Sequence, residues 1–205
     1  MMKKKIFVTV VLALTLAALM LPNTAWAGDN FRFRGKSATA FFFSTDGCVE
    51  TAVFVFASDD RFQSPPGPGD VVSGASIFIS RFDFCTGELL MDASGFASLA
   101  APDFQVIGNL NSATLDTTIE VCDFVSGSCF PVSIDLTWTG TGGLSRENSH
   151  FHFQSPGFNI NSHFNGRFRN AEASGNVSDG ATNFTPASTL SAQIQDLKSG
   201  TIVVD

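Results

Sequence analysis

The sequence contains no tyrosine and, among its 205 residues, only two tryptophans, Trp26 and Trp138. Sugar-binding platforms usually present Trp and Tyr rings, whose polar groups also hydrogen-bond, so carbohydrate recognition is disfavoured. Cationic residues are also scarce, with 12 Lys and Arg against 19 Asp and Glu. Because an acidic surface repels nucleic acid, we expect no nucleic-acid partner.

Recognisable catalytic motifs are missing as well. There is no phosphate-binding loop and no H-E-x-x-H sequence, and residues 143–147 lack the second glycine of a nucleophile elbow. A pair of catalytic carboxylates has no fixed spacing in sequence, so a hydrolase of that kind stays an open alternative.

The first 27 residues are typical of a secretory signal peptide. Lys3, Lys4 and Lys5 precede an apolar run over 6–21, and a small-x-small site ends at Ala27. Cleavage there would leave residues 28–205 as one domain with 9 Lys and Arg against 19 acidic residues. No second long apolar run follows, so we expect no integral membrane segment in the mature chain and a secreted, periplasmic or cell-surface location.

Four short turns with a final glycine divide the rest of the chain, at 44–47, 84–87, 124–127 and 154–157. Gly47, Gly87 and Gly127 are spaced forty residues apart. A four-residue hairpin loop built on a type I turn ends at a positive φ, which suits glycine. The repeat therefore predicts a series of antiparallel hairpins.

Apolar and polar residues alternate on both sides of these turns, most clearly over 112–122 and 132–138, which predicts strands with one buried face. Weaker strands are expected at 171–177, 190–194 and 201–204, although 190–197 also fits a helix. Segments 58–73 and 140–149 are rich in Gly, Pro, Ser and Asp and predict connections. The expected fold is an all-β antiparallel meander of about 8–10 strands, an up-and-down barrel or a two-sheet sandwich.

Four cysteines in an exported chain predict two disulfides. Cys122 and Cys129 flank one turn and would face each other if Asp123 pairs with Ser128, which leaves Cys48 to pair with Cys85. A zinc site is the alternative, but paired C-x-x-C spacing is absent.

The chain is rich in phenylalanine, with 22 residues. Phenylalanine is a large apolar residue, so we expect most of these rings to fill the core. An apolar ligand held inside a barrel is the alternative use.

All three histidines, His150, His152 and His163, lie around the last turn. Pairing Phe153 with Phe158 would place them on one polar face, with His150 diagonal to His163. Neutral imidazoles on neighbouring strands are ligands for Zn²⁺ or Cu²⁺, so this hairpin is a candidate metal site. An exposed polar face lined with Asn and His is the plainer interpretation.

Arginines alternate with Phe in two matching segments, and a strand contact between them would form a basic strip for a carboxylate or phosphate. The candidates are Arg32, Arg34, Arg167 and Arg169. Pairing with nearby Asp and Glu is the alternative. Asp59-Asp60 and Asp179-Gly180 are candidate Ca²⁺ contacts without a specifying spacing.

These patterns predict a secreted, disulfide-stabilised β-domain that binds a macromolecule or a small ligand, or serves as a structural surface component. The alternatives are a metal-binding protein or metal-dependent enzyme centred on the histidines, and a barrel that binds a small apolar ligand.

Overall fold

Nine antiparallel strands form a single sheet in the computed structural model, which describes residues 29–63, 70–155, 158–185 and 189–204. The strands are β1 Asp29–Asp46, β2 Val49–Gln63, β3 Asp70–Asp83, β4 Glu88–Ser98, β5 Phe104–Ile107, β6 Ser112–Asp123, β7 Cys129–Ser155, β8 Phe158–Ser178 and β9 Thr189–Val204. The predicted all-β antiparallel class is confirmed. The predicted signal peptide lies outside the described residues.

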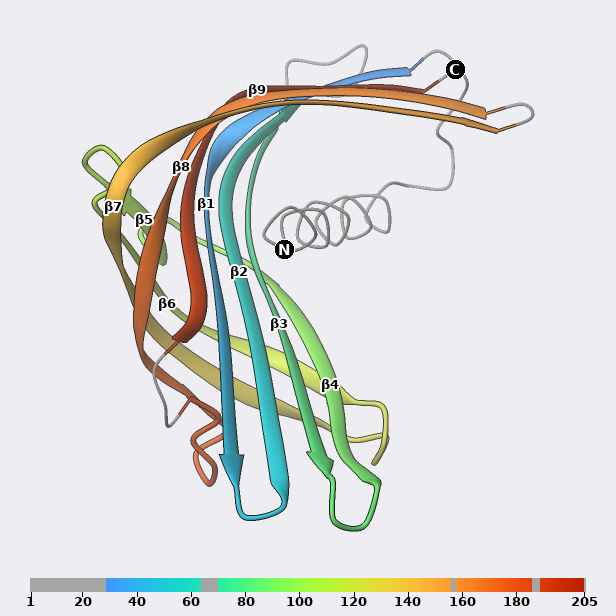
Figure 1. Ribbon diagram of the computed structural model, residues 1–205, viewed down its shortest axis with the longest axis vertical. Helices are drawn as coiled ribbons and strands as arrows, with labels where there is room; N and C mark the ends of the chain where they lie inside the picture. Colours follow the sequence, from blue (N-terminus) through green and yellow to red (C-terminus); the bar gives the residue numbers. More distant parts are fainter. Residues whose placement is uncertain (1–28, 64–69, 156–157, 186–188, 205) are drawn as a thin grey trace.

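The sheet curls until its two sides meet (Figure 1). Its strand order is β4-β3-β2-β1-β9-β8-β7-β6-β5, and β4 also pairs with β6 where Ala93–Gly95 lies opposite Val121–Asp123. This additional pairing makes the fold a barrel closed over a short contact, rather than two stacked sheets. The short strand β5 pairs with the other end of β6.

The core is filled mainly by aliphatic side chains, together with Trp138 and the buried Phe42, Phe104 and Phe184, because inward residues alternate along each strand. The inward residues of β7 are buried, ending at Trp138 with 0% exposure. The indole Nε1 of Trp138 donates a hydrogen bond to the carbonyl oxygen of Thr39 at 2.8 Å. Ala38 and Ala40 flank Thr39 and are themselves buried, and their small side chains let the indole approach the β1 backbone.

Two of the four predicted turns have the expected four-residue form. Gly87 and Gly127 end these loops with φ of 75° and 71°. At the first turn the prediction is wrong, because Asp46 pairs with Val49 and leaves only two loop residues. There the glycine, Gly47, occupies the first loop position with φ 59°, as a type II′ turn requires. At the fourth turn Ser155 pairs with Phe158, so that loop also has two residues, which lie outside the described part.

Both predicted disulfides are confirmed. Cys48–Cys85 joins the β1–β2 turn to the β3–β4 turn, and Cys122 and Cys129 are direct partners across β6 and β7. Because Phe124 N donates to Asp92 O at 2.8 Å, the β6–β7 turn lies beside β4 at the same end of the barrel. We call this the cysteine end.

Three segments differ from the prediction. Residues 140–149 lie within β7 and pair with β8, with one irregularity between Thr141 and Ser145 where Gly142 has φ 67°. The small residues of this segment led to the prediction of a connection. The segment is nevertheless a strand, because β-propensity depends strongly on the neighbours that a strand packs against. The alternative helix at 190–197 is instead part of β9, and strands β2 and β3 extend into both ends of the predicted connection 58–73.

Candidate functional site

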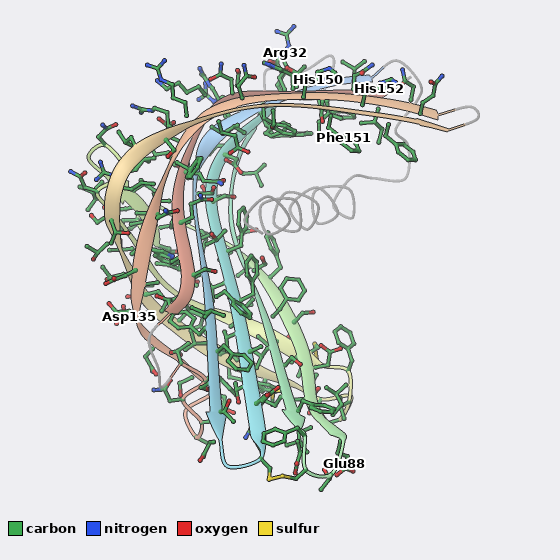
Figure 2. The ribbon with its side chains drawn as sticks, viewed as in Figure 1. Arg32, Glu88, Asp135, His150, Phe151 and His152 are labelled. Carbon is green, nitrogen blue, oxygen red and sulfur yellow. A yellow bond between two sulfur atoms is a disulfide. The ribbon has the colours of Figure 1, made fainter. Side chains whose placement is uncertain are left out.

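The ends of four strands leave the barrel together opposite the cysteine end and bend over to one side (Figure 1). We call residues 29–34, 145–155, 158–167 and 199–204 the arm. Register places alternate residues of these strands on two different faces. In Figure 2, Arg32, His150 and His152 lie on one side of the arm and Phe151 lies on the other.

The polar face of the arm carries all three histidines, as predicted, but in another register. His150 is the direct partner of His163, and His152 is the partner of Asn161. The predicted pairing of Phe153 with Phe158 is wrong, because the turn has two residues and Phe153 pairs with Ile160. The His150–His163 relationship is therefore a direct cross-strand pair rather than a diagonal one.

The histidine side chains are exposed and do not converge on one point. Nδ1 of His152 lies 2.7 Å from Oδ1 of Asn161. The three potential metal ligands that do lie within 4.8 Å of one another in the described chain are Cys48, Asp83 and Cys85. The two sulfurs of that group are bonded to each other, so they offer no thiolate to a zinc ion.

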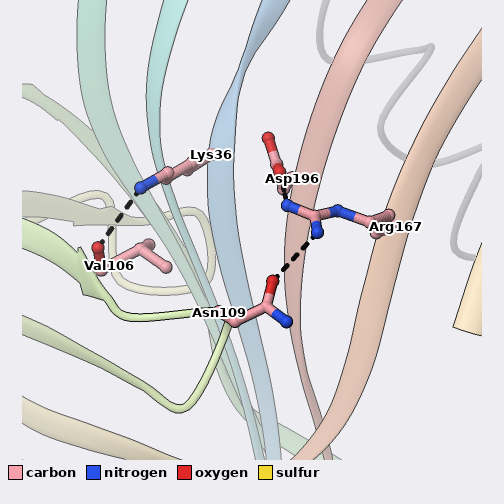
Figure 3. Close-up of polar contacts among 5 residues, drawn as sticks. All are labelled: Lys36, Val106, Asn109, Arg167 and Asp196. Carbon is pink, nitrogen blue, oxygen red and sulfur yellow. Dashed lines mark hydrogen bonds and ion pairs between the residues drawn. The ribbon is translucent and has the colours of Figure 1, made fainter. Parts of the chain in front are cut away.

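The arginines of β8 hold a loop against the barrel, and Figure 3 shows the contacts of Arg167. Arg167 donates to Asn109 Oδ1 at 2.9 Å and forms an ion pair with Asp196 at 2.5 Å. Arg169 donates to Asn111 Oδ1 at 2.7 Å. Both asparagines belong to the β5–β6 loop, so these two arginines position that loop.

The predicted strip of four arginines does not form, because β9 lies between β1 and β8. Arg167 and Asp196 form the sole ion pair within the described ranges. Arg32 and Arg34 are exposed, and Arg34 pairs in register with Arg61 of β2. Arg32 and Arg34 on the polar face of the arm therefore form a basic group with the neighbouring Arg61 of β2.

Most described phenylalanines are not in the core, contrary to the prediction. The buried ones are Phe31, Phe42, Phe104 and Phe184. Register places others together on the outward side of β1–β4. We call this group the phenylalanine face; its members are Phe41, Phe43, Phe54, Phe56, Phe78, Phe82 and Phe96.

The phenylalanine face is continuous across its strands. Phe41, Phe54 and Phe78 are successive partners across β1, β2 and β3, and the rings of Phe54 and Phe78 lie 6.4 Å apart. The ring of Phe96 lies over Gly74, where an added Cβ would come within 2.7 Å of it. Four rings remain 37% to 47% exposed, namely Phe43, Phe78, Phe82 and Phe96.

The charged residues on the same outward side of β1–β4 are acidic. Register places Glu50, Asp60 and Asp92 there. The pKa of Asp60 is raised to about 6, chiefly by burial. A hydrogen bond with Ser58 lowers this pKa, and the negative charge of the neighbouring Asp59 raises it. A Cβ on Gly35 would collide with the Asp60 carboxylate, so the glycine makes room for this side chain.

Two adjoining grooves of about 330 and 350 Å³ lie beside β5 and share Asp59, Ala101 and Phe104. Asp59 accepts a hydrogen bond from Ser73 at 2.7 Å. The other predicted Ca²⁺ contact, Asp179, accepts bonds from the backbone amides of Ala181 and Thr182. Both carboxylates thus have partners within the chain.

Sequence reasoning missed the aspartates that precede two of the turns. Asp83 accepts hydrogen bonds from the amides of Cys85 and Thr86, and Asp123 accepts them from Val125 and Ser126. The signal was present, since an Asp-Phe pair opens both turns and recurs at the same forty-residue spacing. Side chains of this type close turns by binding amides two and three residues ahead.

The chain matches no protein-family model and no curated protein. Within the residues described, no helix has the length and apolar character needed to cross a membrane.

Proposed function

We propose that this protein is an exported, non-catalytic binding and structural domain, and that its phenylalanine face is the binding surface. The disulfide-bonded all-β fold suits such a role. The observation that carries the proposal is the outward position of large apolar rings on a barrel whose interior is already filled.

Large rings are costly to leave in water. Full burial of one phenylalanine side chain is worth about 1.5–3 kcal/mol. Soluble monomers rarely keep contiguous apolar patches of more than a few hundred Å² exposed, and larger patches mark interaction sites. Because the chain has no tyrosine, the aromatic rings of this face offer a partner apolar contact and no hydroxyl groups for hydrogen bonds.

The occupant that we propose is the arm of a second copy of this chain. The arm has an apolar face of its own, on which Phe151 is 38% and Phe153 is 47% exposed. It also carries Arg32, Arg34 and Arg146 exposed on its other face. The arm is only one sheet thick. If its apolar face lies on another surface, the arginines on the opposite face are therefore within about a Debye length of that surface and still attract its charges.

The phenylalanine face has the complementary charge. Its charged residues are the carboxylates Glu50, Asp60 and Asp92, so an arm with exposed arginines is attracted to it. Two copies that each place an arm on the other's phenylalanine face would form a closed two-fold dimer. Both apolar surfaces would then be removed from water in one arrangement.

The molar mass of the exported protein, measured by light scattering after gel filtration, tests the proposal. We expect a dimer at about 100 µM protein. Phe96→Ser on the phenylalanine face and Phe153→Ser on the arm should each shift the mass towards that of a monomer. Phe124→Ser is the matched control, since this ring is 72% exposed at the cysteine end and belongs to neither surface.

A wild-type monomer at that concentration would contradict self-association. So would dissociation by Phe124→Ser to the same degree as by the other two variants. Circular dichroism of each variant confirms that the strands are intact, so that loss of dimer is not confused with unfolding.

A further inference from the structure

The paired histidines of the arm have no assigned task in the proposed assembly. His150 and His163 are direct partners on adjacent antiparallel strands, and both side chains are exposed. Directly opposite residues have Cβ atoms about 4.5–5.5 Å apart and point to the same side of the sheet. Two imidazoles held at this spacing can swing towards one common point above the strands.

A third imidazole, that of His152, lies nearby on the polar face. His152 follows His150 by two residues along β7, so it projects from the same face about 7 Å further along the strand. Its ring is held by Asn161 at 2.7 Å, whereas in the described chain the side chains of His150 and His163 make no hydrogen bond and no ion pair. The two unpartnered imidazoles are therefore the primary donors, and His152 is an auxiliary one.

Among the described residues of this face, the neighbours of the pair include no carboxylate. Thr201 of β9 follows His163 in the same row, and Arg32 of β1 follows Thr201. Hard cations such as Ca²⁺ and Mg²⁺ require oxygen ligands, which makes them poor candidates here. Imidazole nitrogen suits Zn²⁺ and Cu²⁺, which also accept water to complete their coordination.

We propose that His150 and His163 form a cross-strand site for one Zn²⁺ or Cu²⁺ ion per chain, with His152 as an additional ligand. The ion would join β7 to β8 near the end of their hairpin, far from the disulfides. Because this geometry exists only when the two strands are paired, binding would stabilise the folded arm.

Titration calorimetry with ZnCl₂, and the visible absorption of added CuCl₂, test the site on exported protein without an affinity tag. We expect one ion per chain. His150→Ala and His163→Ala should each weaken binding by about tenfold or more, and His152→Ala should weaken it less. All three side chains are exposed, so these variants are expected to keep the wild-type circular dichroism.

The register itself supplies a rescue variant. Asn161 is the partner of His152, so the double substitution H163A/N161H moves the cross-strand pair one position along the face. It should restore binding lost in His163→Ala if a directly opposed pair is what holds the ion. As a matched control, H163A/N165H adds a histidine opposite Asn148 and should not restore binding.

The proposal would be overturned if neither ion bound measurably, or if His150→Ala bound as well as the wild type. A stoichiometry of half an ion per chain would also overturn it, because the ion would then be shared between two copies. Each of these outcomes is independent of the dimer measurement, because the monomeric variant Phe153→Ser retains all three histidines and can be titrated in the same way.

Discussion

The carboxylate of Asp123 accepts a hydrogen bond from the backbone amide of Asp92 at 3.0 Å, across the contact that closes the barrel. Its oxygens also accept bonds from the amides of Val125 and Ser126 and from the Ser126 hydroxyl at 2.7 Å. The bond from the Ser126 hydroxyl is the main reason why the pKa of Asp123 is lowered to about 2. Burial raises this pKa, and the three bonds from backbone amides lower it further. One side chain thus closes the β6–β7 turn and attaches it to β4.

Asp123→Asn should destabilise the protein by about 1–3 kcal/mol at pH 7, because one carboxylate oxygen becomes an amide that faces backbone donors. The lowered pKa gives the sign of the pH dependence. The stabilisation is present above the ordinary pKa of 3.8 and is lost as pH falls towards 2, so the two proteins should converge there. Urea unfolding followed by Trp138 fluorescence measures this difference.

Asp83→Asn is the control, because Asp83 closes the β3–β4 turn in the same way without a bond to a third strand in the part of the chain described. Asp83 is only partly buried, whereas Asp123 is buried, so we expect a loss below about 1 kcal/mol. Equal losses in the two variants would mean that attachment to β4 contributes nothing.

Gly95 is the second determinant of closure. It pairs with Val121, and an added Cβ would collide with the carbonyl oxygen of Glu120, which belongs to the backbone and cannot rotate away. Gly95→Ala should therefore separate β4 from β6 and cost about 1–3 kcal/mol. Faster hydrogen exchange at the amides of Ala93–Gly95 would report the opening directly. Gly143→Ala is the control, since its Cβ would meet no atom within 4 Å.

The sequence predicts the strands best where one face is strictly apolar. Over 132–138 the apolar residues of the alternating pattern are the buried ones, because each inward side chain packs in the barrel. The disulfides follow for the same local reason, since the Asp123–Ser128 pairing places Cys122 opposite Cys129. Such features depend on residues a few positions apart.

The candidate site is less predictable because it depends on register and on distant strands. A two-residue difference in one turn moves His163 from a diagonal position to a direct partner of His150. The insertion of β9 between β1 and β8 separates the arginines, and no local pattern reveals it. The number of phenylalanines likewise does not predict whether their rings lie inside the barrel or on the side of a strand that faces water.

The two disulfides should contribute unequally to stability. Cys48–Cys85 spans 37 residues and Cys122–Cys129 spans 7. By loop-closure entropy alone, the longer link is worth about 4 kcal/mol and the shorter about 2 kcal/mol. Replacing each pair by serine and measuring urea unfolding should show the larger loss for Cys48 and Cys85. The opposite order would mean that the short link acts mainly by holding the closing turn in the folded state.

Asp60 should make the protein less stable as pH rises. Its pKa is raised to about 6 chiefly by burial, whereas the ordinary value is 3.8. Between these values the folded chain holds a proton that the unfolded chain has lost. The favourable contribution is therefore complete below pH 4 and disappears as pH rises through 6.

Asp60→Asn removes this dependence, because the amide stays neutral throughout. The variant should be more stable than the wild type by about 1–3 kcal/mol at pH 8, and the difference should vanish near pH 4. Urea unfolding at both pH values measures it, with Glu172→Gln as an exposed control for which a small and constant difference is expected. A stabilisation that persists at pH 4 would show that the charge of Asp60 is not its cause.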